Sequence, residues 1–212
     1  MKHILLIVSL VGCLAINVSA QQDLKPLASV STFQERLKNE TTRIYTIESN
    51  FTQEKYLDVF EEKVISQGQF FYKREDKIRM EYSKPLSYLI IISGQKLKIV
   101  SEGKSNTISL GSNPMMNEIK SMLSACMVGD LNSLSSSYQP DYFENASLYV
   151  IRIKPVSKSV QAYIREIVVS IDKKDMSVKA LRLWETEKDY TEYIFTHKKY
   201  NTIVSDELFA IP

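Results

Sequence analysis

Apolar residues recur every three or four positions from residue 27 to residue 47, and charged or polar residues stand between them. This period is that of one buried face of an α-helix. The sequence therefore predicts an amphipathic helix over 27–47. Its buried face is expected to hold Leu27, Val30, Phe33, Leu37, Thr41, Ile44 and Ile47.

From about residue 50 to residue 110 the period shortens to two, and aromatic and β-branched residues become frequent. Turn signals at 74–76, 83–85 and 93–94 divide this stretch, which predicts about six antiparallel strands. The runs 70–72 and 87–92 are apolar at consecutive positions, so both faces of those strands are apolar. Either both faces are covered, or one face is the wall of a cavity.

Residues 114–128 predict a second helix, with Pro114 in its first turn and Asn113 as its N-cap. The helix holds four of the seven methionines, Met115, Met116, Met122 and Met127. Methionine is flexible and polarizable, and it recurs on surfaces that accommodate variable partners. Methionine also fills gaps in ordinary protein cores, and this helix taken alone favours a core-facing helix that uses methionine as filler.

Strand patterns resume at about 138–154, 161–172, 177–186 and 189–200, with turns at 154–155, 172–175 and 187–189. The expected fold class is mainly β (α+β). About 10–11 antiparallel strands form a single sheet, and a sheet of that size curls. We expect an incomplete β-barrel whose concave face is covered by the two helices. No repeat or linker divides residues 21–212, which predicts one domain.

Residues 1–20 predict a cleavable secretory signal peptide. A basic start precedes the uncharged run 4–16, and Ala20 ends a small-residue cleavage pattern. The segment around Cys13 (Leu-Val-Gly-Cys) offers an alternative, a lipid-anchored N-terminus. We favour cleavage after Ala20, because the residues that follow Cys13 are still apolar where a tether is usually polar.

Charge and chemistry exclude several classes of function. The formal net charge is +2 with no basic block, which argues against nucleic acid as a partner. No motif typical of a metal, nucleotide or other cofactor site is present, so we expect none of these ligands. Without residues 1–20, His197 is the only histidine and Cys126 the only cysteine, and Cys126 lies in an apolar helix. The sequence therefore predicts that the protein is not an enzyme; a hydrolase would have to depend on His197.

Several short motifs resemble the outer-membrane lipoprotein carrier (LolA-like) family, in the same order and spacing. They are Phe-Thr-Gln at 51–53, a segment from Gly68 through Lys73-Arg74 to Pro85, Gly-Gln-Lys-Leu at 94–97, and Phe-Ala-Ile-Pro at 209–212. The resemblance covers nearly all of the chain after residue 20. Glu75 stands where the family has proline, Met80 where it has tryptophan, and Lys98 where an aromatic residue is common.

The resemblance implies a half-barrel with an apolar cavity beneath its helices. It implies a monomeric periplasmic carrier that binds lipoproteins through their acyl chains. Such a carrier accepts them from an inner-membrane lipoprotein-releasing ABC transporter and passes them to an outer-membrane acceptor. The alternatives are a membrane-anchored acceptor and a lipoprotein-sensing module on the same fold. The family's strand arginine is Arg74, which implies a latch that hydrogen-bonds the covering helices in the empty state. Composition alone favours a surface arginine beside a turn.

If Arg74 points toward the helices, the period of two places a set of strand residues on the same face. Residues of the second helix are expected to face them across the cavity. The predicted cavity lining is Phe70, Tyr72, Ile78, Met80, Tyr82, Leu97 and Ile99 from the strands, and Met115, Ile119, Met122 and Leu123 from the helix.

Overall fold

The computed structural model describes residues 24–211 except 76, 132–133, 135–137 and 203, so the expected signal peptide and Cys13 lie outside the described residues. The N-terminal half contains α1 (Val30–Thr41), the single turn η1 (Asp58–Phe60) and seven strands. The strands are β1 (Lys25–Pro26), β2 (Thr46–Leu57), β3 (Glu62–Lys73), β4 (Lys77–Lys84), β5 (Tyr88–Ser93), β6 (Lys96–Ser101) and β7 (Lys104–Ser109).

The C-terminal half begins with α2 (Pro114–Val128) and continues with five strands, a short helix and a final turn. These are β8 (Tyr138–Glu144), β9 (Leu148–Pro155), α3 (Lys158–Gln161), β10 (Glu166–Asp172), β11 (Val178–Trp184), β12 (Tyr190–Tyr200) and η3 (Asp206–Phe209).

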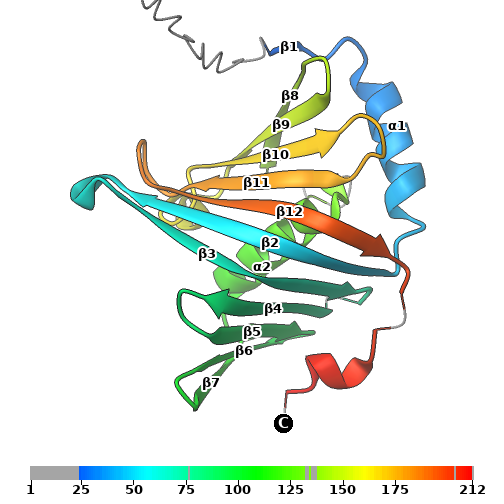
Figure 1. Cartoon of the computed structure of the whole chain (residues 1–212). Helices are drawn as coiled ribbons and strands as arrows, with labels where there is room; N and C mark the ends of the chain where they lie inside the picture. The colour runs from blue at the N-terminus through cyan, green and yellow to red at the C-terminus, as the bar shows by residue number, and fades with distance from the viewer. Residues whose placement is uncertain (1–23, 76, 132–133, 135–137, 203, 212) are drawn as a thin grey trace, which may run out of the picture.

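All described strands belong to one antiparallel sheet of 12 strands, in the order β1-β8-β9-β10-β11-β12-β2-β3-β4-β5-β6-β7. The sheet curves strongly but does not close, and α2 lies across its hollow side (Figure 1). The predicted incomplete barrel is therefore confirmed. Strand β12 pairs with β2, which joins the two halves of the chain in the middle of the sheet.

The helix predicted over 27–47 is too long at both ends. Helix α1 starts after Ser29, whose hydroxyl accepts a hydrogen bond from the Thr32 N–H, and ends at Thr41. From Thr46 the chain is strand β2, in which Ile47 is buried. The spacing of Ile44 and Ile47 matched a helix by coincidence: Ile44 lies in the connection before the strand and is partly buried, and Ile47 is buried by β2.

The strand predicted over 138–154 is two strands. The side chain of Asn145 accepts hydrogen bonds from the N–H groups of Ser147 (2.9 Å) and Leu148 (2.8 Å), which forms a tight turn between β8 and β9. The strand predicted from residue 161 begins only at Glu166, after α3. With the two-residue strand β1 added, the sheet has 12 strands rather than 10–11.

Helix α2 has the predicted bounds. The Asn113 side chain accepts from the Met116 N–H (3.2 Å), and Gly129 ends the helix with a φ of 86°. The inner face of α2 contributes Met122 and Cys126, both fully buried, to the main core. Helix α1 packs at the end of the barrel and contributes Phe33 and Leu37 to the same core; the ring centroids of Phe33 and Tyr149 are 4.7 Å apart.

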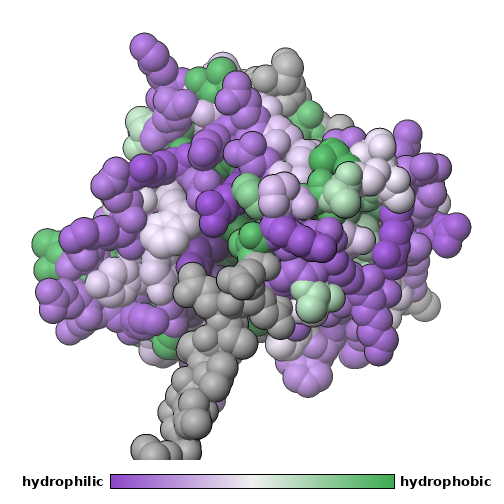
Figure 2. Space-filling model, turned by 90° about the horizontal axis from the view of Figure 1, so that it is seen from above, coloured by the Kyte–Doolittle hydropathy of each residue, from purple (hydrophilic) through white to green (hydrophobic). Residues whose placement is uncertain are grey.

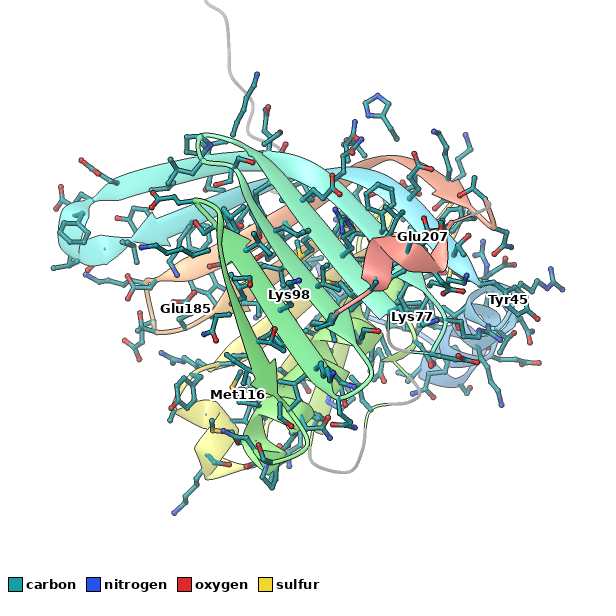
Figure 3. All side chains as sticks on the ribbon, turned by 90° about the horizontal axis from the view of Figure 1, so that it is seen from below. Tyr45, Lys77, Lys98, Met116, Glu185 and Glu207 are labelled. Atoms are coloured by element: carbon teal, nitrogen blue, oxygen red, sulfur yellow. The ribbon has the colours of Figure 1, made fainter. Side chains whose placement is uncertain are left out.

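The C-terminal segment covers the outer face of β4 and β5. Phe209 and Val204 form a second apolar cluster there with Ile91. Asp206 accepts a hydrogen bond from Lys77 (2.7 Å) and pairs with Lys73 (3.1 Å). Figure 3 shows η3, with Glu207 labelled, lying against these strands. In the described part of the chain, no helix is both long enough and apolar enough to cross a membrane.

Candidate functional site

A cavity of about 470 Å³ lies between α2 and the inner faces of strands from both halves of the sheet. Its size is within the range of small-molecule pockets, roughly 300–1,000 Å³. Most of its wall is apolar: Ile78, Met80, Ile90, Ile92, Leu97, Ile99, Leu110, Met116, Ile119, Leu123, Met127, Ile164 and Leu183, with the rings of Tyr163 and Tyr193. Lys120, Ser124, Glu185 and Thr191 are the polar residues of the wall.

The register of the sheet explains why these side chains converge. Met80 pairs with Ile90, and Ile90 pairs with Ile99. Residues directly opposite each other in antiparallel strands point to the same face. Curvature of the sheet then turns this apolar stripe toward α2.

Six of the eleven residues predicted for the cavity lie on its wall: Ile78, Met80, Leu97, Ile99, Ile119 and Leu123. The structure places Phe70, Tyr82 and Met122 in the packed core of the barrel, each at most 3% exposed. Tyr72 and Met115 are partly buried against that core. Phe70, Tyr72 and Tyr82 still share the inner face with the wall residues, because Phe70 pairs with Met80, Tyr72 with Ile78, and Gly68 with Tyr82.

Sequence reasoning missed several wall residues. Ile90 and Ile92 lie in the run 87–92, whose two apolar faces were the signal for a covered face or a cavity. The register of the β4–β5 hairpin, which includes Met80, would have placed these two residues on the cavity face. Leu183 and Tyr193 come from the other half of the sheet. Only the curvature of the whole sheet brings them opposite β4–β6, and no local pattern encodes it.

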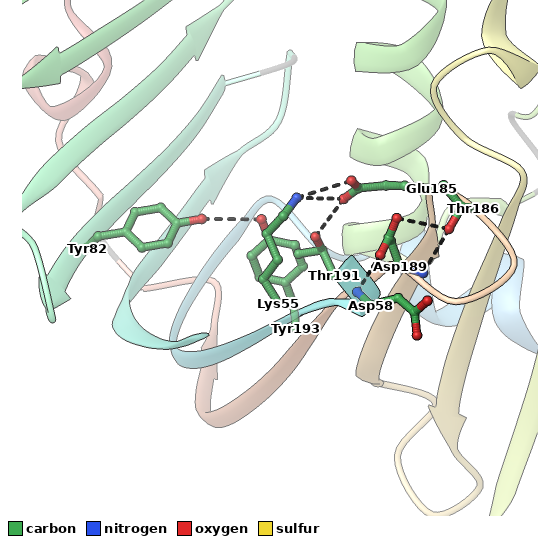
Figure 4. A network of polar contacts seen from close by, with 8 residues as sticks. All are labelled: Lys55, Asp58, Tyr82, Glu185, Thr186, Asp189, Thr191 and Tyr193. Atoms are coloured by element: carbon green, nitrogen blue, oxygen red, sulfur yellow. Dashed lines mark hydrogen bonds and ion pairs between the residues drawn. The ribbon is translucent and has the colours of Figure 1, made fainter. Parts of the chain in front are cut away.

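A polar network borders the cavity at one end (Figure 4). Lys55 Nζ donates to both oxygens of Glu185 (3.0 and 3.1 Å), and Thr191 Oγ1 donates to Glu185 Oε1 (2.9 Å). The hydroxyls of Tyr82 and Tyr193 are 3.2 Å apart. Burial raises the pKa of Tyr193 to about 12 and raises that of Tyr82 as well, so both phenols stay neutral. The end of the cavity thus offers neutral hydroxyls beside one ion pair.

Arg74 lies at the opposite end of the barrel, in the turn between β3 and β4. Its Nη2 donates to the carbonyl oxygens of Thr42 (2.6 Å) and Ile44 (2.9 Å). Its Cζ lies 4.3 Å from the ring centroid of Tyr45, and its backbone N–H donates to Tyr45 O (2.8 Å). Figure 3 shows Tyr45 and Glu185 at opposite ends of the molecule. These bonds hold the end of α1 and the segment that follows it.

The family model described as outer membrane lipoprotein carrier protein LolA matches residues 42–212. The chain belongs to this family. Its membership confirms the resemblance based on the short motifs. No curated protein matches the sequence.

Several solved structures are similar to this chain at low sequence identity. A LolA superfamily protein from Nitrosomonas europaea is 11% identical, with a TM-score of 0.45, over 84% of this chain and 97% of its own. The lipoprotein LppX from Mycobacterium tuberculosis is 10% identical, with a TM-score of 0.41, over 82% and 96%. A chain of the MucA/MucB complex of Pseudomonas aeruginosa is 11% identical, with a TM-score of 0.46, over 85% and 60%.

Neither His197 nor Cys126, the only histidine and cysteine among the described residues of this LolA family member, lies on the cavity wall. His197 is exposed, and its Nδ1 lies 3.2 Å from the hydroxyl of the neighbouring Thr196. Cys126 is fully buried, and burial raises its thiol pKa to about 12, so the thiolate is not formed near neutral pH. Among the described residues, no group of three or more histidine, cysteine or acidic side chains is placed to hold a metal ion.

Proposed function

We propose that this protein is a periplasmic carrier that binds the acyl chains of lipoproteins in the 470 Å³ cavity. As a carrier it takes lipoproteins from an inner-membrane releasing ABC transporter and passes them to an outer-membrane acceptor. The observation that carries the proposal is the apolar wall itself, in a chain of the LolA family. Its fifteen apolar and aromatic residues against four polar ones suit a ligand that is mostly hydrocarbon.

The energetics of such a site favour binding strongly. Each CH₂ group that leaves water contributes about 0.8 kcal/mol, so a chain of ordinary length is bound tightly. A carrier must also release its cargo, which requires an empty state of comparable free energy. We propose that Arg74 helps to stabilise that state. Its two hydrogen bonds to Thr42 and Ile44 hold the α1 end of the barrel closed, and they break when cargo enters.

A cavity-filling substitution tests the proposal. Leu123 is on the face of α2 that lines the cavity. The larger side chain of Leu123→Trp occupies space that a bound acyl chain would need. We expect the variant to bind a fluorescent fatty-acyl probe at least tenfold more weakly than the unsubstituted protein. Ile194→Trp is the matched control, because Ile194 is on the exposed outer face of β12 and the same large ring there leaves the cavity unchanged.

Two results would contradict the cavity assignment. One is equal probe binding by Leu123→Trp and Ile194→Trp, with both variants folded by circular dichroism. The other is failure of lipoprotein acyl chains to displace the probe.

The N-terminus separates the carrier from the membrane-anchored alternatives. Mass spectrometry of the protein from its native envelope is expected to find Gln21 as the first residue. An acylated Cys13 would favour an anchored acceptor or a lipoprotein-sensing module instead.

A further inference from the structure

The β2–β3 hairpin projects beyond the rest of the sheet. Strand β4 pairs with β3 only from Gln67 onward, so residues 62–66 of β3 have no partner on that side. Figure 1 shows the hairpin extending past the ends of its neighbours. Its turn holds Val59 and Phe60, which are 80% and 66% exposed. We call these two residues the apolar tip.

Other exposed apolar side chains lie at the same end of the barrel as the apolar tip. Val64 and Ile65, on the projecting part of β3, are also exposed. Leu86, in the turn after β4, is 69% exposed, and β4 ends at the same end of the barrel as β2. Figure 2 shows an apolar patch at its left edge, where Figure 1 places the hairpin turn, among hydrophilic neighbours. Val59 and Phe60, which are adjacent and largely exposed, make the tip a candidate interaction site.

An aromatic band lies behind the tip on the outer face of the sheet. The rings of Tyr56 and Tyr190 stack at 5.6 Å, and Trp184 lies 5.1 Å from Tyr190. Arg182 covers the Tyr190 ring at 4.6 Å. Tyr56 lies near the end of β2, three residues before Val59 in the η1 turn. Tyrosine, tryptophan and basic side chains behind an apolar group are typical of the membrane–water interface.

The charge of the hairpin indicates which lipids it fits. From residue 54 to residue 65 it carries four acidic and two basic side chains. Glu61 and Glu62 directly follow the apolar tip and are exposed. A surface with this balance is repelled by anionic lipids, because their negative potential attracts basic segments. Carboxylates beside the tip instead complement the ammonium groups of zwitterionic head groups.

We propose that the apolar tip inserts into the surface of a zwitterionic membrane and holds the polar end of the cavity beside the bilayer. Lys55 belongs to the same hairpin and bonds Glu185 of the cavity wall, so the hairpin is joined to that end of the cavity. The inference goes beyond the proposed carrier function. It also differs from delivery through protein partners alone, because it gives the chain a direct contact with lipid.

The test is flotation of the purified protein with phosphatidylcholine vesicles. We expect the unsubstituted protein to float with the vesicles, with little dependence on salt, and less of it to float when phosphatidylglycerol replaces part of the lipid. The affinity of the double variant Val59→Ser/Phe60→Ser for the vesicles is expected to be lower by about tenfold or more. Burial of one such side chain changes affinity by at least that factor. The matched control is Leu24→Ser/Ile194→Ser, which removes two apolar side chains, each 40% exposed, elsewhere on the surface.

Three results would overturn the proposal. These are no flotation of the unsubstituted protein, equal flotation of the two double variants, and binding that requires phosphatidylglycerol and disappears in salt. Slower lipoprotein transfer by the tip variant without any vesicle binding would assign the hairpin to a protein partner instead. The acyl-probe assay separates this outcome from failure of the carrier proposal, because the tip variant keeps the whole cavity wall and is expected to bind the probe normally.

Discussion

Replacement of Arg74 by leucine tests whether its hydrogen bonds act on cargo or only on stability. The substitution removes two charge-assisted bonds, to Thr42 O at 2.6 Å and to Ile44 O at 2.9 Å, and the contact with the Tyr45 ring. Bonds of this kind contribute about 1.5–3 kcal/mol each in buried settings. Arg74 is only half-buried, so we take about 2–3 kcal/mol for the whole set.

The two interpretations of Arg74 predict different results. If Arg74 only anchors a turn, Arg74→Leu lowers the melting temperature by roughly 5–10 °C and leaves acyl-probe affinity unchanged. If it is a latch, the empty closed state loses the same free energy, and the open state gains population. Each 1.4 kcal/mol is a factor of ten, so we expect affinity for the acyl probe to rise about tenfold or more.

A two-step transfer assay measures the functional consequence. Arg74→Leu is expected to accept lipoproteins from inner membranes and to pass them on more slowly to outer membranes. Arg74→Lys keeps the charge but not the forked donor geometry. Its rate of transfer to outer membranes is expected to lie between those of the unsubstituted protein and Arg74→Leu. Poor loading by Arg74→Leu together with normal delivery of what is loaded would refute the latch and leave the turn anchor.

Three further predictions concern stability and reactivity. At Gly68, an added Cβ would lie 2.0 Å from Glu81 O and 2.7 Å from Phe51 Cζ. Gly68→Ala is therefore expected to lower the free energy of unfolding in urea by about 1–3 kcal/mol. Gly111→Ala is the control and is expected to be neutral, because its added Cβ meets nothing nearer than 3.6 Å. Lys77 and Lys73 lower the pKa of Asp206, so its contribution is present above the unfolded-state pKa of about 3.9 and is lost as the pH falls through the folded-state pKa. Urea stabilities of the unsubstituted protein and Asp206→Asn should therefore differ at neutral pH and converge in acid; a constant difference would contradict this. Cys126, buried with a pKa of about 12, is expected to react with a thiol reagent only at the rate of unfolding, and rapid labelling of the folded protein would show that α2 opens locally.

Local sequence patterns were sufficient to predict the bounds of an element where its end signals and its packing agree. Helix α2 has a capping side chain at Asn113, a proline in its first turn and a glycine after its last, and its bounds follow from those signals. Helix α1 lacks such an end signal. Thr41 and Thr42 are β-branched, but the apolar spacing continues through them to Ile47, and only pairing with β3 and β12 shows that Ile47 belongs to a strand.

The residues that line the cavity follow only in part from the sequence, for a physical reason. Parity along one hairpin puts Ile78 and Met80 on one face, because side chains alternate along a strand, and both line the cavity. Parity cannot tell a wall residue from a packed one on the same face. Phe70 shares the face of Met80 but packs in the core, where its ring centroid lies 5.4 Å from that of Phe195. Which residues stay at the free surface of the cavity depends on the curvature of the sheet and on the position of α2.

The contents of the cavity test the carrier account most directly. The measurement is native mass spectrometry of the protein released gently from the cell envelope, followed by extraction and identification of any bound acyl chain. We predict that the unsubstituted protein carries acylated cargo and that Leu123→Trp carries much less. An unmodified bare mass in both proteins, or the same bound species in both, would contradict the claim that the cavity beneath α2 holds acyl chains.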